Sequence, residues 1–270
     1  MRKVSIFALT LATLFSLSFL SVDNSYFRKP AQITDFSSYH QVDGGSIENI
    51  PNNSVVEGSL AYDGMQPNYI IDLDTPLLKQ YLNEAKLIGE EESDFWTKIS
   101  KISDLVSKKA LRERDYDSPS YINLTRYYKD SELDIPLSEY IDCSVGVCRE
   151  HALLIHLLLN SAGIKNKHTY AEIRRVNNAE DYNIVENHGF VTVEHKGKTW
   201  VVDSYYKGFN GYLLNDLLSE NGITIQSEKA PIAKELIDFR RIIKIHDYPK
   251  VWIPKNNEGC LELMDNFHKS

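Results

Sequence analysis

The sequence predicts an α+β fold in which one buried helix packs against a mostly antiparallel sheet. Helix-spaced apolar residues are concentrated in the first two thirds of the chain, and alternating apolar residues follow them. Helices followed by strands, without regular alternation, are typical of the α+β class. The stretch 149–162 is apolar on nearly every side, which indicates that this helix is buried.

Composition supports a folded domain and excludes several other classes of protein. Of the 270 residues, 42% are apolar and 25% are charged, so the chain has enough apolar side chains for a core. These values exclude a wholly disordered chain, a collagen-like chain and a small disulfide-rich protein. The formal net charge is -8. Because an acidic chain is poorly suited to contact phosphates, we expect no nucleic-acid partner.

The N-terminus has the pattern of a secretory signal. Arg2 and Lys3 precede an uncharged, mostly apolar stretch that runs to residue 22, and small residues around Ser18 offer a cleavage site. We therefore expect a signal peptide at 1–18 and a secreted or periplasmic protein with no stable membrane association after cleavage. An uncleaved N-terminal membrane anchor is the alternative, since the stretch is nearly long enough to span a bilayer.

The rest of the chain divides into three parts. Residues 19–74 are rich in turn-forming residues and are expected to be a loop-rich N-terminal segment. Residues 75–250 carry the periodic patterns of one domain, with a helical part at 75–115 and a core at 120–250. Residues 251–270 are expected to be a C-terminal tail.

Three helices are expected before the sheet. The first begins at Thr75-Pro76, where a capping residue precedes a proline at the first helical position, and it is expected to end at Gly89. The second begins near Ser93. The third is the buried helix over 149–162.

After the buried helix the apolar residues alternate, which is typical of strands with one face on a core. Lys196-Gly197 separates two of these strands as a tight hairpin turn. The expected strands are 167–173, 188–195, 198–205 and 241–246, and a short helix is expected at 213–218.

Three residues in this arrangement form a candidate nucleophilic site. Cys148 lies at the start of the buried helix, where the helix dipole favours a thiolate, the attacking species in acyl transfer. If the hairpin turn has two residues, His188 and Asp203 become diagonal neighbours on one face of the sheet. A turn with one residue more would put them on opposite faces, so the spacing allows the contact but does not require it.

These residues also resemble a known family. The segments GVCREHA (146–152), HGFVTVE (188–194) and GKTWVVD (197–203) are similar to the nucleophile, histidine and aspartate motifs of the transglutaminase-like superfamily. The resemblance covers about residues 140–206. It implies a papain-like fold and a catalytic domain at 75–250. It also implies a Cys148, His188 and Asp203 triad, with the nucleophile on the central helix and the other two residues on neighbouring strands.

The sequence departs from the family at one position near the site. The family often has an aromatic residue directly after its histidine, whereas Gly189 stands here. The segment between Ile173 and His188 is polar and acidic, and it is either a lip that attracts a basic substrate or a solvated face. The oxyanion donor is not assigned: the N–H of Cys148 is one candidate, and a second donor is expected upstream of Cys143.

The function that follows is a secreted thiol acyl-transfer enzyme. It would hydrolyse or transfer an amide, either a peptide bond or a glutamine side chain, in a protein or peptide substrate, and hydrolysis is favoured over cross-linking. No cofactor and no metal are expected, because no calcium-binding loop is present and Cys143, Cys148 and His151 do not have the spacing of a zinc site. The alternatives are a non-catalytic protein-binding module on the same fold and a structural or adhesion protein.

The chain has three cysteines, and an odd number in an exported protein leaves one unpaired. Cys143 paired with Cys260 would leave Cys148 free. Cys143 paired with Cys148 would instead switch the enzyme off by oxidation.

Overall fold

The computed structural model describes residues 36–43, 46–58, 66–176, 185–234, 239–246 and 249–255. The expected signal peptide at 1–18 and Cys260 lie outside these ranges. So do residues 177–184 of the acidic segment that precedes His188.

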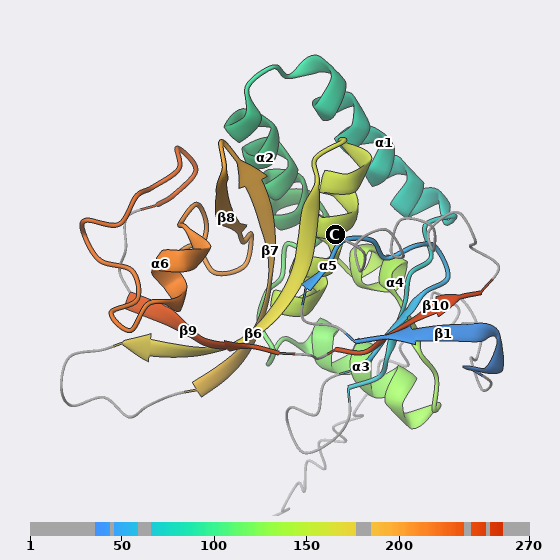
Figure 1. Cartoon of the computed structure of the whole chain (residues 1–270). Helices are drawn as coiled ribbons and strands as arrows, with labels where there is room; N and C mark the ends of the chain where they lie inside the picture. The colour runs from blue at the N-terminus through green and yellow to red at the C-terminus, as the bar shows by residue number, and fades with distance from the viewer. Residues whose placement is uncertain are drawn as a thin grey trace, which may run out of the picture.

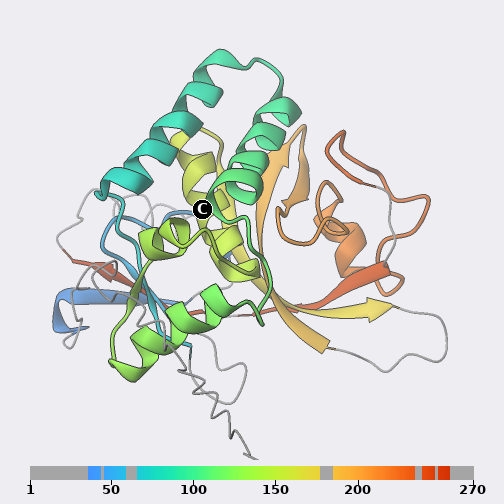
Figure 2. The ribbon, with the colours of Figure 1, turned by 180° about the vertical axis from the view of Figure 1, so that it is seen from behind.

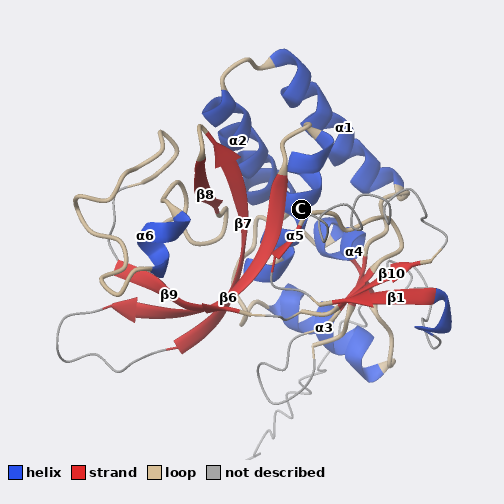
Figure 3. Cartoon of the chain, in the orientation of Figure 1, coloured by secondary structure: helices blue, strands red, loops and turns tan. Residues whose placement is uncertain are grey.

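The described residues form a mixed α+β structure, as the sequence predicts (Figures 1 and 3). The helices are η2 (Phe36–Ser38), α1 (Pro76–Glu91), α2 (Phe95–Asp104), the π-helix η3 (Leu105–Ala110), α3 (Pro119–Asp130), α4 (Leu137–Asp142), α5 (Cys148–Ser161) and α6 (Leu214–Leu218). The strands are β1 (Tyr39–Val42), β2 (Ser46–Ile47), β3 (Val55–Val56), β4 (Tyr69–Ile70), β5 (Ile135–Pro136), β6 (Asn166–Val176), β7 (Val185–His195), β8 (Lys198–Val202), β9 (Phe239–Ile245) and β10 (Val251–Pro254).

The strands form two sheets. The first has the order β1-β10-β3-β4-β5, and the second has the order β2-β6-β7-β8 with β9 also paired to β6. Every pairing is antiparallel except the one between β4 and β5. The second sheet carries the long strands that the sequence predicts. The first is built largely from two-residue strands that the sequence does not reveal.

Helix α5 lies at the centre of the molecule. It packs against β6 and β7 on one side and against α1 and α2 on the other, an arrangement that can be followed from both sides in Figures 1 and 2. The first twelve residues, Cys148–Leu159, are all buried, which confirms the prediction of a helix without a solvent face. It ends before Gly163, which adopts a left-handed conformation with φ of 72° and terminates the helix.

The β7–β8 hairpin has the predicted register. His195 pairs with Lys198 and Val191 with Val202, so the turn contains only Lys196 and Gly197, both with positive φ. Alternate residues of this hairpin therefore face two different cores. Val191, Val193, Trp200 and Val202 face the core that contains α5, whereas Phe190 and Val201 face a smaller core under α6.

Helix α1 continues past the position where the sequence predicts its end. Gly89 lies inside the helix, which runs to Glu91. A Cβ atom at Gly89 would lie 2.5 Å from the carbonyl oxygen of Ala162. The glycine therefore allows α1 to approach the end of α5 closely, and it does not terminate the helix.

Two expected boundaries also differ from the structure. Strand β10 begins at Val251, in the segment expected to be a tail, and pairs with both β1 and β3. Val55 and Ile71 of the expected loop-rich segment are fully buried. The strands at both ends of the described chain therefore belong to the folded domain, although much of the described part of the N-terminal segment is irregular.

Three buried histidines make the stability of this fold sensitive to acid. Burial lowers the pKa of His156 to about 4 and the pKa values of His151 and His168 to about 3. An unfolded chain binds protons at histidine near pH 6.5, whereas the folded chain holds these three side chains neutral. The contribution of these three side chains to the free energy of unfolding should therefore be highest above about pH 6.5 and should fall progressively as the pH drops toward 4.

Urea unfolding between about pH 7 and pH 5 measures this dependence, and each histidine contributes up to about one proton to its slope. His188 acts in the opposite direction, because its pKa is raised to about 9: its contribution to stability is complete below about pH 6.5 and is lost as the pH rises toward 9. His168→Asn should reduce the slope, whereas Ser161→Ala, which removes no titrating group, should not. An equal slope in both variants would contradict the assignment to the buried groups.

Candidate active site

Cys148 is the first residue of α5, and its side chain is only 3% exposed. The helix begins here because Glu150 accepts a hydrogen bond of 2.7 Å from the N–H of Val147, which satisfies a backbone donor at the helix start. The thiol therefore lies at the positive end of the helix dipole, where a thiolate is favoured.

The structure brings His188 and Asp203 into direct contact. The Nε2 atom of His188, on β7, lies 2.6 Å from Oδ2 of Asp203, the residue that follows β8. The two-residue hairpin turn produces this contact, because it places both side chains on the same face of the sheet. His188 is fully buried and Asp203 is 4% exposed.

The carboxylate of Asp203 is held by the turn that follows it. Its Oδ1 atom accepts hydrogen bonds from the N–H groups of Tyr205 at 2.8 Å and Tyr206 at 2.9 Å. Its own N–H donates to Oδ1 of Asn210 at 3.1 Å. These bonds fix one carboxylate oxygen on the backbone and leave the other for His188.

Cys148 and His188 shift each other's pKa in opposite directions. Burial alone would raise the pKa of the thiol, but the hydrogen bond to His188 and its charge, with smaller contributions from Tyr116 and the Gly189 N–H, lower it below the ordinary value. Burial alone would lower the pKa of His188, but Asp203 and Cys148 together raise it to about 9. Because Nε2 is occupied by Asp203, Nδ1 is the ring nitrogen left to interact with Cys148, and this buried atom has no hydrogen-bond partner among the described residues.

These shifts favour a thiolate and imidazolium pair over a neutral thiol and imidazole. The pair forms above the lowered pKa of Cys148 and is lost when His188 releases its proton near pH 9. Such a pair supplies both an activated nucleophile and a proton donor for a leaving group.

A third group contacts the nucleophile, and sequence reasoning did not identify it. The hydroxyl of Tyr116 lies 3.5 Å from Sγ of Cys148. Tyr116 belongs to the loop between η3 and α3, upstream of Cys143, which is the region where the sequence predicts a second oxyanion donor. No periodic pattern marks a loop tyrosine, so only the folded chain shows which of the sixteen tyrosines reaches the site.

Gly189, the position at which the sequence departs from the family, faces α5. A Cβ atom here would lie 3.4 Å from Cβ of Ala152 and 3.4 Å from the carbonyl oxygen of Cys148. A methyl group would just fit, but the helix backbone leaves no room for an aromatic ring in this direction. The glycine thus allows β7 to lie directly against the first turn of α5.

Cys143 and His151, which the sequence also marks as candidates, do not contact Cys148, His188 or Asp203 through a hydrogen bond among the described residues. Cys143 is half-buried and has no disulfide partner among the described residues, and burial followed by the charges of Glu139 and Asp142 raises its pKa to about 11. Nδ1 of His151 contacts Oγ of Ser204. Among the described residues, no three His, Cys, Asp or Glu side chains gather in a way that could hold a metal ion.

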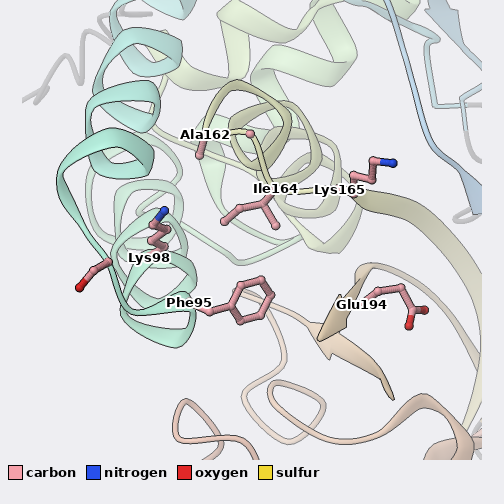
Figure 4. Close-up of a pocket in the computed structure, with 8 residues that line it drawn as sticks. Phe95, Lys98, Ala162, Ile164, Lys165 and Glu194 are labelled. Atoms are coloured by element: carbon pink, nitrogen blue, oxygen red, sulfur yellow. The ribbon is translucent and has the colours of Figure 1, made fainter. Parts of the chain in front are cut away.

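A surface hollow lies at the opposite end of α5 from Cys148. Figure 4 shows Phe95, Lys98, Ile164 and Glu194 around it, and its volume is about 270 Å³. Because α5 rises by 1.5 Å per residue, this hollow is about 20 Å from the thiol along the helix axis. It is therefore separate from the candidate site.

In the part of the chain that the structure describes, no helix has both the length and the apolar character needed to cross a bilayer.

Comparison with known proteins gives limited information about this chain. No family profile matches it, and no curated protein matches it. One solved structure that resembles it is a protein from Cytophaga hutchinsonii, provisionally described as a cysteine protease. The two chains are 15% identical, with a TM-score of 0.31, over 66% of this chain and 69% of the other. A likeness at that level establishes neither a fold family nor an activity.

The raised pKa of His188 predicts a specific effect of Asp203. Asp203→Asn keeps the shape of the side chain but removes its charge, so the pKa of His188 should fall from about 9 by roughly one to two units. NMR titration of the His188 ring protons measures this change directly. Asp216→Asn on α6 is the control, and an equal titration of His188 in both variants would show that Asp203 does not set its pKa.

Proposed function

We propose that this chain is a secreted enzyme of the transglutaminase-like superfamily that breaks or transfers an amide bond through a covalent thioester. The observation that carries the proposal is the chain of contacts from Cys148 through His188 to Asp203, in which the pKa of the thiol is lowered and that of the imidazole is raised. Buried groups whose pKa values are shifted by a specific charge partner cluster at catalytic sites. Secretion is inferred from the first 22 residues of the sequence.

The proposed reaction begins with attack of the Cys148 thiolate on the carbonyl carbon of an amide. The thiol proton resides on His188, and Asp203 holds the imidazolium in place. When the C–N bond breaks, the leaving nitrogen takes the proton from His188 and a thioester remains on Cys148. Water or an amine then attacks the thioester, with His188 accepting the proton of the attacking group, and the free thiol is restored.

Tyr116 and the backbone N–H of Cys148 are the proposed oxyanion donors. The hydroxyl of Tyr116 already lies 3.5 Å from Sγ, so a carbonyl carbon bonded to that sulfur would place its oxygen within reach of the phenol. Burial is the main reason that the pKa of Tyr116 is raised far above its ordinary value, with a further contribution from Cys148. The phenol therefore keeps its proton and can donate it in a hydrogen bond.

Three outcomes are chemically close because only the leaving and accepting groups differ. Water as acceptor gives deamidation of a glutamine side chain or cleavage of a peptide bond, and a lysine amine as acceptor gives a cross-link. We favour hydrolysis, with a protein or peptide as the substrate. Neither a metal nor a cofactor is required for any of these steps.

Intact-mass spectrometry of a glutamine-rich protein such as casein, incubated with the mature enzyme and a primary amine, distinguishes the three outcomes. Deamidation adds about one dalton, transfer adds the mass of the amine, and proteolysis gives fragments. Cys148→Ala should reduce whichever product forms by about a thousandfold or more. A product that persists in Cys148→Ala would exclude the proposed nucleophile. A wild-type thiol of ordinary reactivity with no product would instead favour a non-catalytic binding module.

The role of Tyr116 can be tested with the same product. Tyr116→Phe should lower kcat by about a hundredfold with little change in KM, because an oxyanion donor acts mainly in the transition state. Tyr212→Phe removes the hydroxyl of another buried tyrosine, in the core under α6, and should leave kcat near the wild-type value. An equal loss of kcat in both variants would assign the effect of Tyr116→Phe to general loss of packing.

A further inference from the structure

A buried hydrogen bond links the nucleophile helix to the segment that carries Asp203. Nδ1 of His151, which lies one helical turn after Cys148, is 2.7 Å from Oγ of Ser204. His151 is fully buried and Ser204 is 8% exposed. Because Ser204 directly follows Asp203, this bond joins two elements that contribute separate members of the proposed triad.

Strand pairing does not by itself hold Asp203 in place. The ladder between β7 and β8 ends at the pair of Val191 and Val202, one residue before Asp203. The hydrogen bonds that Asp203 receives from Tyr205 and Tyr206 lie within its own turn. They fix the shape of the turn, but they do not fix its position relative to α5.

The same turn is also tied to the loop that carries Tyr116. Arg114 donates from Nη1 to the carbonyl oxygen of Ser204 at 3.1 Å and from Nη2 to that of Ser107 at 3.0 Å. The hydroxyl of Tyr205 donates to the carbonyl oxygen of Arg114 at 3.1 Å. Ser204 is therefore the point at which the Asp203 turn contacts both α5 and the loop of the proposed oxyanion donor.

His151 makes its contact as an uncharged ring. Its pKa is lowered to about 3, chiefly by burial and also by the positive charges of Arg114 and His188, while the backbone of Leu111 acts in the opposite direction. A neutral imidazole can share a hydrogen bond with a serine hydroxyl without placing a second positive charge beside His188. This matters because His188 is itself protonated in the active pair.

We propose that His151 and Ser204 are positioning residues, whose hydrogen bond keeps the Asp203 turn docked on α5 so that Asp203 stays in contact with His188. The inference rests on the proposed triad. It gives His151, one helical turn after the nucleophile, a role that is neither catalytic nor metal-binding. Loss of the bond would let Asp203 drift from His188, which would weaken the imidazolium and with it the thiolate of Cys148.

Ser204→Ala tests the inference with little change in volume. In a Cys143→Ser, Cys260→Ser background, the rate of alkylation by iodoacetamide reports on Cys148 alone, and its pH dependence follows the thiolate. The pH at which the alkylation rate is half-maximal should be higher in Ser204→Ala by about one pH unit, because part of the stabilisation of the thiolate by His188 and Asp203 is lost. The rate of product formation should fall by about tenfold or more through misplacement of the pair.

The matched control is Ser161→Ala, at the other end of the same helix. The hydroxyl of Ser161 also donates one hydrogen bond, of 2.8 Å, to the carbonyl oxygen of Leu82. This variant should show a similar small loss of thermal stability and the pH profile of the wild type. A Ser204→Ala profile equal to that of Ser161→Ala would overturn the positioning role and leave only a structural bond.

A second pair of variants covers the case in which Ser204→Ala does not fold. His151→Asn keeps a polar group near the position of Nδ1. His151→Leu introduces a side chain of nearly the same shape as asparagine but without a polar group. His151→Asn should retain more of the low-pH alkylation than His151→Leu, and equal profiles would contradict the inference. If Cys148 of the wild type is alkylated with the pH dependence of a free cysteine, the proposed triad itself is wrong. If the wild type shows the lowered pH profile and the variants do not change it, only the positioning role of His151 and Ser204 is wrong.

Discussion

The close contact between α5 and β7 is the constraint on which the candidate site depends. Cys148 belongs to the helix and His188 to the strand, so their interaction exists only while the two backbones lie nearly in contact. The absence of a large side chain at Gly189 allows this, because a Cβ atom there would already be in van der Waals contact with Ala152 and the carbonyl oxygen of Cys148 at 3.4 Å. The complete burial of the first three turns of α5 keeps the helix in this position, since any movement would expose apolar side chains on some face.

The same burial sets the electrostatics of the site. Removing Cys148 and His188 from water opposes the charged form of each group, yet the pKa of the thiol falls and that of the imidazole rises. Both shifts therefore reflect specific partners that overcome desolvation, chiefly Asp203 for the imidazole and His188 for the thiol. Such a buried pair is stable only when each charge is matched by a neighbour, which is why the position of Asp203 has consequences for the thiol.

The parts of the fold that could be predicted are those whose pattern repeats within one element. Helix α5 and the β7–β8 hairpin have continuous apolar periodicity, and the positive φ values of Lys196 and Gly197 fix a register that brings His188 to Asp203. The two-residue strands of the first sheet are too short for any period, and they form only because distant segments meet. Helix α3 is different, since Ser118 and Pro119 give the same start signal as Thr75 and Pro76, and this signal could have identified it.

Tyr116 shows why the site could be predicted only in part. The nucleophile begins α5, the histidine lies within β7 and the aspartate directly follows β8, so the regular elements determine the directions of all three side chains. Tyr116 lies in a loop that begins after a π-helix, and the wider turn there shifts the side chains that follow by one position relative to an α-helix. The loop is then held by Arg114, through bonds to Ser107 on one side and Ser204 on the other. The contact of Tyr116 with the thiol is therefore the product of three separate segments, and no local pattern in any one of them contains it.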